Sequence, residues 1–130
     1  MTTIELSLPA DGTAVAVAVG GARRFAVDLP ARVADRLAII VEELVENLVE
    51  HAVQPPDAVI RLGIWVDAGR VWLRLVDQAA PFDPRHAVMM PVPARGGGAG
   101  LALVRAWTRI ERYDREAGCN VLLLSMPLSG

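Results

Sequence analysis

Apolar and polar residues alternate along several stretches of the chain, which predicts strands. Residues 3–8 (TIELSL) alternate as a short strand, and the sequence PADG then ends it. Residues 58–77 read as a β-hairpin, because apolar residues alternate on both sides of the sequence DAGR. Residues 109–128 read as a second hairpin that closes the chain.

Helical spacing of apolar residues predicts two helices and leaves a third segment ambiguous. The strongest helix covers residues 31–51, which follow a proline and precede the sequence QPP. Its apolar stripe consists of Val33, Leu37, Ile40, Val41, Leu44 and Leu48. Residues 99–110 form another good helix. Residues 13–27 alternate like a strand up to Val19 but also repeat at helical spacing, and we favour a helix there.

The order of these elements predicts the class of fold. It runs strand, helix, helix, two strands, loop, helix and two strands over a single domain, residues 1–130. Such an order predicts an α+β two-layer sandwich, in which a mixed, mostly antiparallel sheet is covered on one face by helices. The irregular stretch from Gln78 to Gly98 is long for so small a domain, and such loops are often functional.

Composition narrows the functional classes. The chain has 130 residues, of which 53% are hydrophobic, and its net charge of -2 offers no basic field for nucleic acid. Cys119 is the only cysteine, which suits a reducing compartment. Neither a signal peptide nor an apolar run of membrane-spanning length is found, so we expect a cytoplasmic protein without membrane contact. We expect Arg109, Arg112 and Arg115 to form a solvated face.

Three polar residues lie four positions apart on the helix of residues 31–51. On a helical wheel, Glu43 falls at the border of the apolar stripe, Asn47 lies further in and His51 lies inside it, because a spacing of four drifts by about 40° per step. Buried polar groups without partners cost about 1–3 kcal/mol, so this polar seam needs a protein partner or a ligand. An amphipathic helix with an untidy edge explains the seam equally well on this segment alone.

Two further stretches favour a ligand. Asp77, in the sequence DQAAPFDP, follows a predicted strand and faces the long loop, although an Asp in this place is usually a turn former. Glycines at positions 96, 97, 98 and 100 run into a helix, where backbone amides can approach phosphate oxygens. Neither a Walker-type loop nor a dinucleotide fingerprint fits, because Leu101 and Ala102 follow the last glycine and no strand directly precedes the run.

Taken in order, EELVENLVEHA, DQAAPFDP and GGGAGLALV resemble the motifs of the ATP-binding fold shared by gyrase, the heat-shock chaperones, histidine kinases and MutL. More closely, the chain resembles the bacterial anti-sigma factor serine kinases. The resemblance covers nearly the whole chain, including the closing sequence GCNVLLLSMPL. It implies that residues 12–27 are helical, because a helix follows the first strand in that family.

The resemblance also implies roles for site residues. Asn47 would coordinate Mg²⁺ bridging the phosphates of ATP, and Glu43 would act as base on the attacking hydroxyl. Asp77 would accept a hydrogen bond from the adenine amino group, in a pocket shaped by Pro81 and Phe82.

Residues 85–95 would form the ATP lid, and Arg95 would stabilise charge on the transferring group. Gly98 and Gly100 would let backbone amides reach the phosphates. The other positions expected to contact the nucleotide are His51, Ala79, Gly96, Gly97 and Leu101.

Two departures from the family pattern bear on ATP binding. Ala79 stands where the family has a glycine close to the base, so an added methyl group either is absorbed or crowds the adenine. The lid is short and rich in proline, with few of the acidic residues common there.

The resemblance predicts an ATP-dependent serine kinase that holds a sigma factor and phosphorylates a serine of an antagonist protein, and it also implies a homodimer. The first alternative is a nucleotide-gated binding module that transfers no phosphate. A detached histidine-kinase catalytic domain is disfavoured, because no phosphoacceptor helical hairpin precedes the domain. A plain interaction domain without nucleotide would follow if Ala79 closed the pocket.

Overall fold

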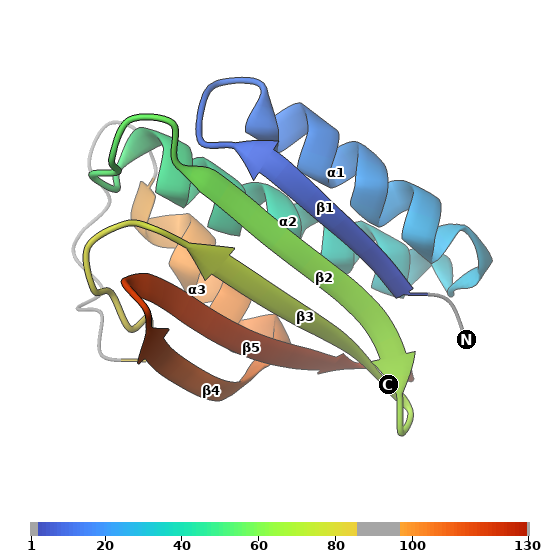
Figure 1. Cartoon of the computed structure of the whole chain (residues 1–130). Coiled ribbons are helices and arrows are strands. Elements are labelled where there is room, and N and C mark those ends of the chain that lie inside the picture. Colours follow the sequence, from blue (N-terminus) through green and yellow to red (C-terminus); the bar gives the residue numbers. More distant parts are fainter. Residues whose placement is uncertain (1–2, 86–96, 130) are drawn as a thin grey trace.

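The computed structural model describes residues 3–85 and 97–129, which form a sheet and a layer of helices (Figure 1). The strands are β1 (Thr3–Pro9), β2 (Val59–Asp67), β3 (Arg70–Asp77), β4 (Arg109–Glu116) and β5 (Cys119–Pro127). The helices are α1 (Ala14–Phe25), the short 3₁₀ helix η1 (Ala26–Asp28), α2 (Ala31–Glu50) and α3 (Gly97–Trp107). This order of elements is the one that the apolar pattern predicts.

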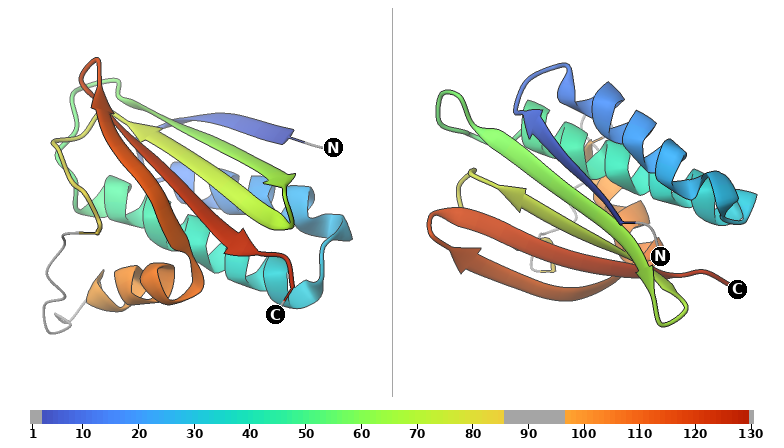
Figure 2. Two further views of the ribbon diagram at one scale, coloured as in Figure 1. Left: turned by 90° about the horizontal axis from the view of Figure 1, so that it is seen from below. Right: turned by 45° about the vertical axis from the view of Figure 1, so that its right-hand side comes forward.

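The sheet has five strands in the order β1-β2-β3-β5-β4. All four pairings between these described strands are antiparallel, so the sheet is more regular than the expected mixed one. The three α-helices lie on one face of the sheet, as the two further views show (Figure 2). The predicted class, an α+β two-layer sandwich, is confirmed.

Helix α1 forms in the segment whose sequence alternates like a strand. Ala14, Ala18 and Ala22 recur every four residues and are fully buried, so small side chains bring this helix close to the sheet. Gly21 shows how close the approach is, because a Cβ atom built on it would lie 2.5 Å from Cδ1 of Leu6 on β1. The helix implied by the family resemblance is therefore present, and the alternation of Ala and Val does not mark a strand.

Helix α2 buries the predicted apolar stripe against the sheet. All six members of the stripe are buried, and Ala38 and Val45 join them. The helix ends at Glu50, where the backbone N–H of His51 donates to the Asn47 carbonyl at 3.0 Å. The polar seam of α2 therefore lies beside the core, near the end of the helix.

Both predicted hairpins are present, and the two strands of each are joined by a turn with the sequence Ala-Gly. Ala68 and Gly69 connect β2 to β3, and Ala117 and Gly118 connect β4 to β5, all four with positive φ. Two successive positive φ angles are typical of the tight turn whose twist matches that of the flanking strands. The two hairpins lie side by side through the pairing of β3 with β5, which sets Asp77 at the end of β3 directly opposite Asn120 near the start of β5.

The three tryptophans lie on both sides of the sheet. Trp107 packs against the core. The guanidinium of Arg36 lies over its ring, 5.1 Å from the centroid, in a cation–π contact. Trp65 and Trp72 are register partners on β2 and β3 and stack with their centroids 6.4 Å apart. Their chain neighbours Ile64 and Leu73 are buried under the helices, so this pair projects from the opposite face.

Candidate functional site

A cavity of about 310 Å³ opens between helix α2, the ends of β3 and β5, and the segment that follows β3. Leu44 and Leu48 of α2 line it together with Leu75 and Leu122 from the sheet. This volume lies at the lower end of the roughly 300–1,000 Å³ typical of small-molecule sites. The remaining lining residues are Asn47, His51, Ala52, Val53, Asp77, Ala79, Ala80, Pro81, Phe82, Pro84, Leu101, Tyr113 and Asn120. Seven of them are among the predicted site residues: Asn47, His51, Asp77, Ala79, Pro81, Phe82 and Leu101.

Asp77 is the buried carboxylate of this cavity, with 5% of its surface exposed. Its Oδ1 accepts hydrogen bonds from the backbone N–H of Ala79 and from Nδ2 of Asn120, each at 2.9 Å. Its Oδ2 accepts no hydrogen bond from the described residues. One carboxylate oxygen is thus fixed by the protein, while the other remains available to a ligand in the cavity.

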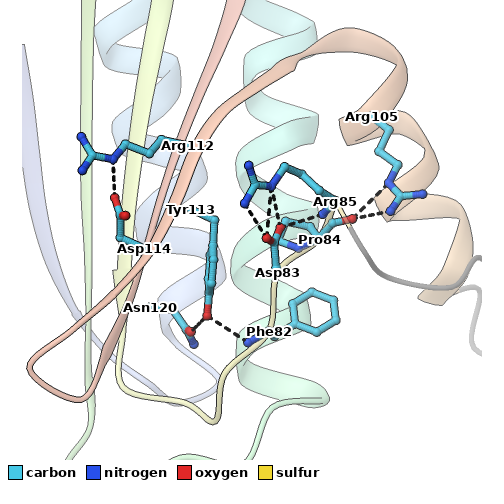
Figure 3. Close-up of polar contacts among 9 residues, drawn as sticks. All are labelled: Phe82, Asp83, Pro84, Arg85, Arg105, Arg112, Tyr113, Asp114 and Asn120. Atoms are coloured by element: carbon cyan, nitrogen blue, oxygen red, sulfur yellow. Dashed lines mark hydrogen bonds and ion pairs between the residues drawn. The ribbon is translucent and has the colours of Figure 1, made fainter.

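Asn120, near the start of β5, connects the β4–β5 hairpin to the segment that begins at Asp77. Figure 3 shows its contact with Tyr113 of β4. Besides Asp77, its Nδ2 donates to the carbonyl of Ala80 at 3.0 Å and to that of Ala79 at 3.3 Å. Its Oδ1 accepts from the Tyr113 hydroxyl and from Nη1 of Arg115, the latter at 3.2 Å. The Asn120 side chain lies on the same face of the sheet as the buried Leu122 and Leu124, and each of its polar atoms has a hydrogen-bond partner.

Arg115 is not only solvated, as predicted, but also forms hydrogen bonds to the segment beside the cavity. Its side chain is exposed overall, but Nη1 donates to the Ala79 carbonyl at 2.7 Å as well as to Asn120. Arg112 and Arg109 keep to the expected pattern, since they pair with Asp114 and Glu111 of their own strand. Of the three arginines, therefore, Arg115 alone contacts the wall of the cavity.

Ala79, which replaces the family's glycine, fits its position without backbone strain. The non-glycine residues with positive φ in the described ranges are Asp57, Ala68 and Ala117, so Ala79 has an ordinary negative φ. It is 2% exposed and lines a cavity that stays open around it. The methyl group narrows the cavity without closing it.

The residues after Ala79 form one side of the cavity mouth. Pro81 and Phe82 both line the cavity, and Phe82 is 44% exposed. The backbone N–H of Phe82 donates to the Tyr113 hydroxyl at 3.3 Å, and the guanidinium of Arg105 on α3 donates to the Pro84 carbonyl (Figure 3). Contacts from β4 and α3 thus hold this segment in place.

The polar seam of α2 faces the same region. Asn47 and His51 line the cavity, and both also line a smaller hollow next to it, together with Glu43, Glu46 and Leu101. The Asn47 side chain forms no hydrogen bond with any described residue, so its amide is available to a ligand. His51 is half-exposed, with Nε2 3.8 Å from Oε2 of Glu50. All three predicted seam residues therefore line the smaller hollow, and Asn47 and His51 also line the cavity.

Glu43 lies in the smaller hollow and not in the main cavity. Partial burial raises the pKa of its carboxyl group, and the negative charges of Glu46 and Glu42 raise it further. A carboxylate with a raised pKa is a stronger proton acceptor than an exposed one. Its position and its pKa are therefore compatible with the predicted role as base.

The glycine-rich motif is described only in part. Gly97, Gly98 and Gly100 belong to the first turn of α3, which begins at Gly97. Arg95, Gly96 and nearly all of the predicted lid, from His86 onward, lie outside the described residues.

The oxygen atoms of the smaller hollow suit a metal ion that binds together with a phosphate-bearing ligand. Within the described ranges, no three His, Cys, Asp or Glu side chains come together as a metal site. The hollow offers the amide oxygen of Asn47 and two nearby carboxylates, Glu43 and Glu46. Mg²⁺ commonly takes few protein oxygens and several phosphate oxygens and waters, so these residues fit a magnesium ion bound together with nucleotide phosphates.

None of the helices in the described part of the chain combines the length and the apolar character needed to cross a membrane.

Sequence reasoning missed Tyr113 and Asn120, the two polar residues that the β4–β5 hairpin contributes to the cavity. Asn120 alternates with the buried Leu122 and Leu124, so it is a polar residue on the inward side of a strand. That break in the alternation is the signal that could have identified it.

The fold and the cavity together define a two-layer α+β domain with a small-molecule-sized site between helix α2 and the sheet. The family model of the histidine kinase-like ATPase domain matches residues 8–126, and the chain belongs to this family. The predicted kinship with kinases of this ATP-binding fold is confirmed.

Among known proteins, the chain is similar to the serine/threonine-protein kinase BtrW of Bordetella bronchiseptica. The two are 33% identical over 101 residues, which are 73% of this chain and 71% of the relative.

Two solved structures share the fold. One is the blue-light activated histidine kinase of Erythrobacter litoralis EL346, with a TM-score of 0.61 and 18% identity, covering 93% of this chain. The chain spans only 42% of that kinase. The other is the histidine kinase AdeS of Acinetobacter baumannii, with a TM-score of 0.55, 14% identity, and coverage of 100% of this chain and 70% of that one.

Proposed function

We propose that the chain is a serine-protein kinase of the anti-sigma factor type. In this proposal it binds ATP with Mg²⁺, transfers the γ-phosphate to a serine of an antagonist protein, and sequesters a sigma factor. The observation that carries the proposal is the arrangement of Asp77 and Asn47 around one cavity, each with a polar group that no described residue occupies. The relationship to a serine/threonine-protein kinase supports the choice of acceptor.

The ends of a nucleotide match the two parts of the site. The purine would fill the main cavity, between the leucines of α2 and the sheet, with its amino group donating to Oδ2 of Asp77. The phosphates would extend toward Asn47 and the first turn of α3, where backbone N–H groups favour anions. His51 and Leu101 line both hollows, so they would lie beside the part of the nucleotide that joins them.

The transfer step would use Glu43 as the base. The serine Oγ attacks the γ-phosphorus, the bond from that phosphorus to the oxygen bridging to the β-phosphate breaks, and the serine proton passes to the Glu43 carboxylate. ADP is the leaving group. Asn47 would hold Mg²⁺ through its amide oxygen, and the ion supplies charge neutralisation for the phosphates.

The homodimer is proposed on the character of α1 and β1. Residues 14–22 of α1 carry no charged side chain although the helix lies at the surface, where Val17 is 48% exposed. β1, beside it in Figure 1, is an edge strand of the sheet. An uncharged helix face next to an unpaired strand edge favours association with a second copy. The mass in solution, by light scattering, tests this part on its own.

Calorimetric titration with ATP, with and without Mg²⁺, tests the nucleotide site. Asn47→Ala should remove the magnesium-dependent part of the affinity and leave the magnesium-free part unchanged, because only the metal contact is lost. Arg32→Ala is the matched control, since this exposed residue lies on the same helix outside both hollows. Equal magnesium dependence in the wild type and Asn47→Ala would refute the assignment.

Transfer is tested with γ-labelled ATP and purified antagonist candidates of the same genome, each compared with its serine-to-alanine variants. Label on one serine supports the kinase. Tight ATP binding without label on any of them would favour a nucleotide-gated binding module instead.

A further inference from the structure

We propose that Asn120 is a positioning residue for base recognition, held by Tyr113 and Arg115 so that it turns one oxygen of Asp77 toward the base. The inference rests on the proposed function, because it concerns how the nucleotide site reads adenine. It adds a chain of three contacts from the β4–β5 hairpin that reaches the base only through Asp77.

The orientation of the Asn120 amide is fixed from β4. The Tyr113 hydroxyl accepts a hydrogen bond from the backbone N–H of Phe82, so its own proton is free to point at Asn120 Oδ1. Nη1 of Arg115 can only donate, and it donates to the same oxygen at 3.2 Å. Two donors on one side of the amide require its oxygen there and its nitrogen on the other side.

The nitrogen of this amide then fixes Asp77. With Oδ1 turned toward Tyr113, Nδ2 of Asn120 faces Oδ1 of Asp77 at 2.9 Å. The Ala79 N–H donates to the same Asp77 oxygen, also at 2.9 Å. Two donors hold this oxygen, so the carboxylate cannot rotate without losing both, and Oδ2 is the oxygen left for the ligand.

Asn120 has no polar capacity left for the nucleotide itself. Its two N–H groups serve Asp77 and the carbonyls of Ala79 and Ala80, and its oxygen serves Tyr113 and Arg115. Although it lines the cavity, it offers the base no free donor or acceptor. Its effect on base recognition therefore runs through Asp77.

The test compares two nucleotides that differ only in the group Asp77 would bind. ATP carries the 6-amino group of adenine, whereas purine riboside 5′-triphosphate has hydrogen in its place. In the wild type, calorimetry should show about 10-fold to 100-fold tighter binding of ATP, as expected for one hydrogen bond to a charged acceptor. In Asn120→Ala this preference should fall to less than about 3-fold, while affinity for the analogue changes little.

Two variants separate positioning from general stability. Ser125→Ala is the matched control, since Ser125 is another buried polar residue of β5, and its hydroxyl bonds Glu111 and Arg70 away from the cavity. It should lower the melting temperature and leave the ATP preference intact. Tyr113→Phe keeps the ring but removes the hydroxyl, so it should reduce the preference partly, and it decides the matter if Asn120→Ala does not fold.

The outcomes distinguish this inference from the function on which it rests. A wild type that binds neither triphosphate refutes the nucleotide site itself. A wild type that prefers ATP, with the full preference kept in folded Asn120→Ala and in Tyr113→Phe, refutes the positioning role alone. Equal losses for both nucleotides would also overturn it, because a purely structural role predicts that result.

Discussion

Oδ1 of Asp77 accepts the backbone N–H of Ala79, two residues further along the chain, at 2.9 Å. This short-range bond explains how the position tolerates a residue other than glycine. Any residue except proline supplies the N–H, and the negative φ of Ala79 suits any L-amino acid. A glycine here would therefore serve the space beside the base and not the conformation of the backbone.

Ala79→Gly is expected to bind ATP as tightly as the wild type or more tightly, because the methyl group leaves the wall of the cavity. The same change should lower the free energy of unfolding by about 0.4–1 kcal/mol, since glycine gives the unfolded chain more freedom. Calorimetry and denaturant unfolding measure the two effects separately. A clear loss of affinity would contradict the view that the methyl group only occupies space.

Asp77→Asn should weaken ATP binding by about 10-fold to 100-fold, and it should raise the affinity for GTP relative to the affinity for ATP. The two donors on Oδ1 require the new amide oxygen at that place, so the NH₂ group faces the cavity. It would then meet the adenine amino group donor to donor, whereas the guanine oxygen could accept from it. Competition between ATP and GTP in calorimetry measures the change. Asp67→Asn, at the exposed end of β2, should alter neither affinity.

The raised pKa of Glu43 predicts a dependence of stability on pH. Its stabilising contribution is complete below the unfolded value, near 4.5, and is lost as the pH rises through the raised pKa of the folded state. Glu43→Gln mimics the protonated form at every pH. It should match the melting temperature of the wild type near pH 4 and exceed it at neutral pH.

The same variant should lose about 10²-fold to 10⁴-fold in phosphoryl transfer while it keeps ATP binding. Glu46→Gln removes the first of the two charges that raise the pKa of Glu43, so it should move the acid limb of the pH–rate profile to lower pH. Glu50→Gln, an exposed change on the same helix, should leave the profile where it is. An unchanged profile in Glu46→Gln would contradict the role of Glu43.

The two adjacent glycines of α1 should respond differently to alanine. A Cβ on Gly20 meets only the end of the Arg24 side chain, at 3.4 Å, so Gly20→Ala should gain about 0.8–1 kcal/mol of helix propensity. A Cβ on Gly21 meets Leu6 at 2.5 Å, so displacement of Leu6 should cancel that gain. Denaturant unfolding of both variants tests this. Equal stabilisation would show that α1 and β1 are packed less tightly than described.

The parts of the fold that follow from a single periodicity could be predicted from the sequence. Both hairpins and α2 show their apolar spacing clearly. Helix α1 could not be predicted in this way, because alternating Ala and Val satisfy both periods, and its small residues are chosen for close packing on β1. The pattern favoured a helix there without deciding it, and the family resemblance decided it.

Only part of the candidate site could be predicted from the sequence. Asn47, Asp77 and Phe82 belong to short local motifs, and the structure brings them to one cavity. Tyr113 and Asn120 lie more than thirty positions after Asp77 and reach the site through strand pairing, which is not encoded in any local pattern. The contact of the exposed Arg115 could not be predicted for the same reason, because its partner, the Ala79 carbonyl, is distant in sequence.

In the proposed site, the pairing of Asp77 with Asn120 across β3 and β5 would make the recognition of the base sensitive to insertions and deletions. A residue added at the exposed Ala117–Gly118 turn lies outside β3 and β5, so it does not interrupt their pairing. A residue added between Asn120 and Leu122 would reverse the side chain of Asn120 to the outer face of the sheet. The proposed base specificity would therefore depend on the number of residues in β5 before Leu122 as much as on their identity.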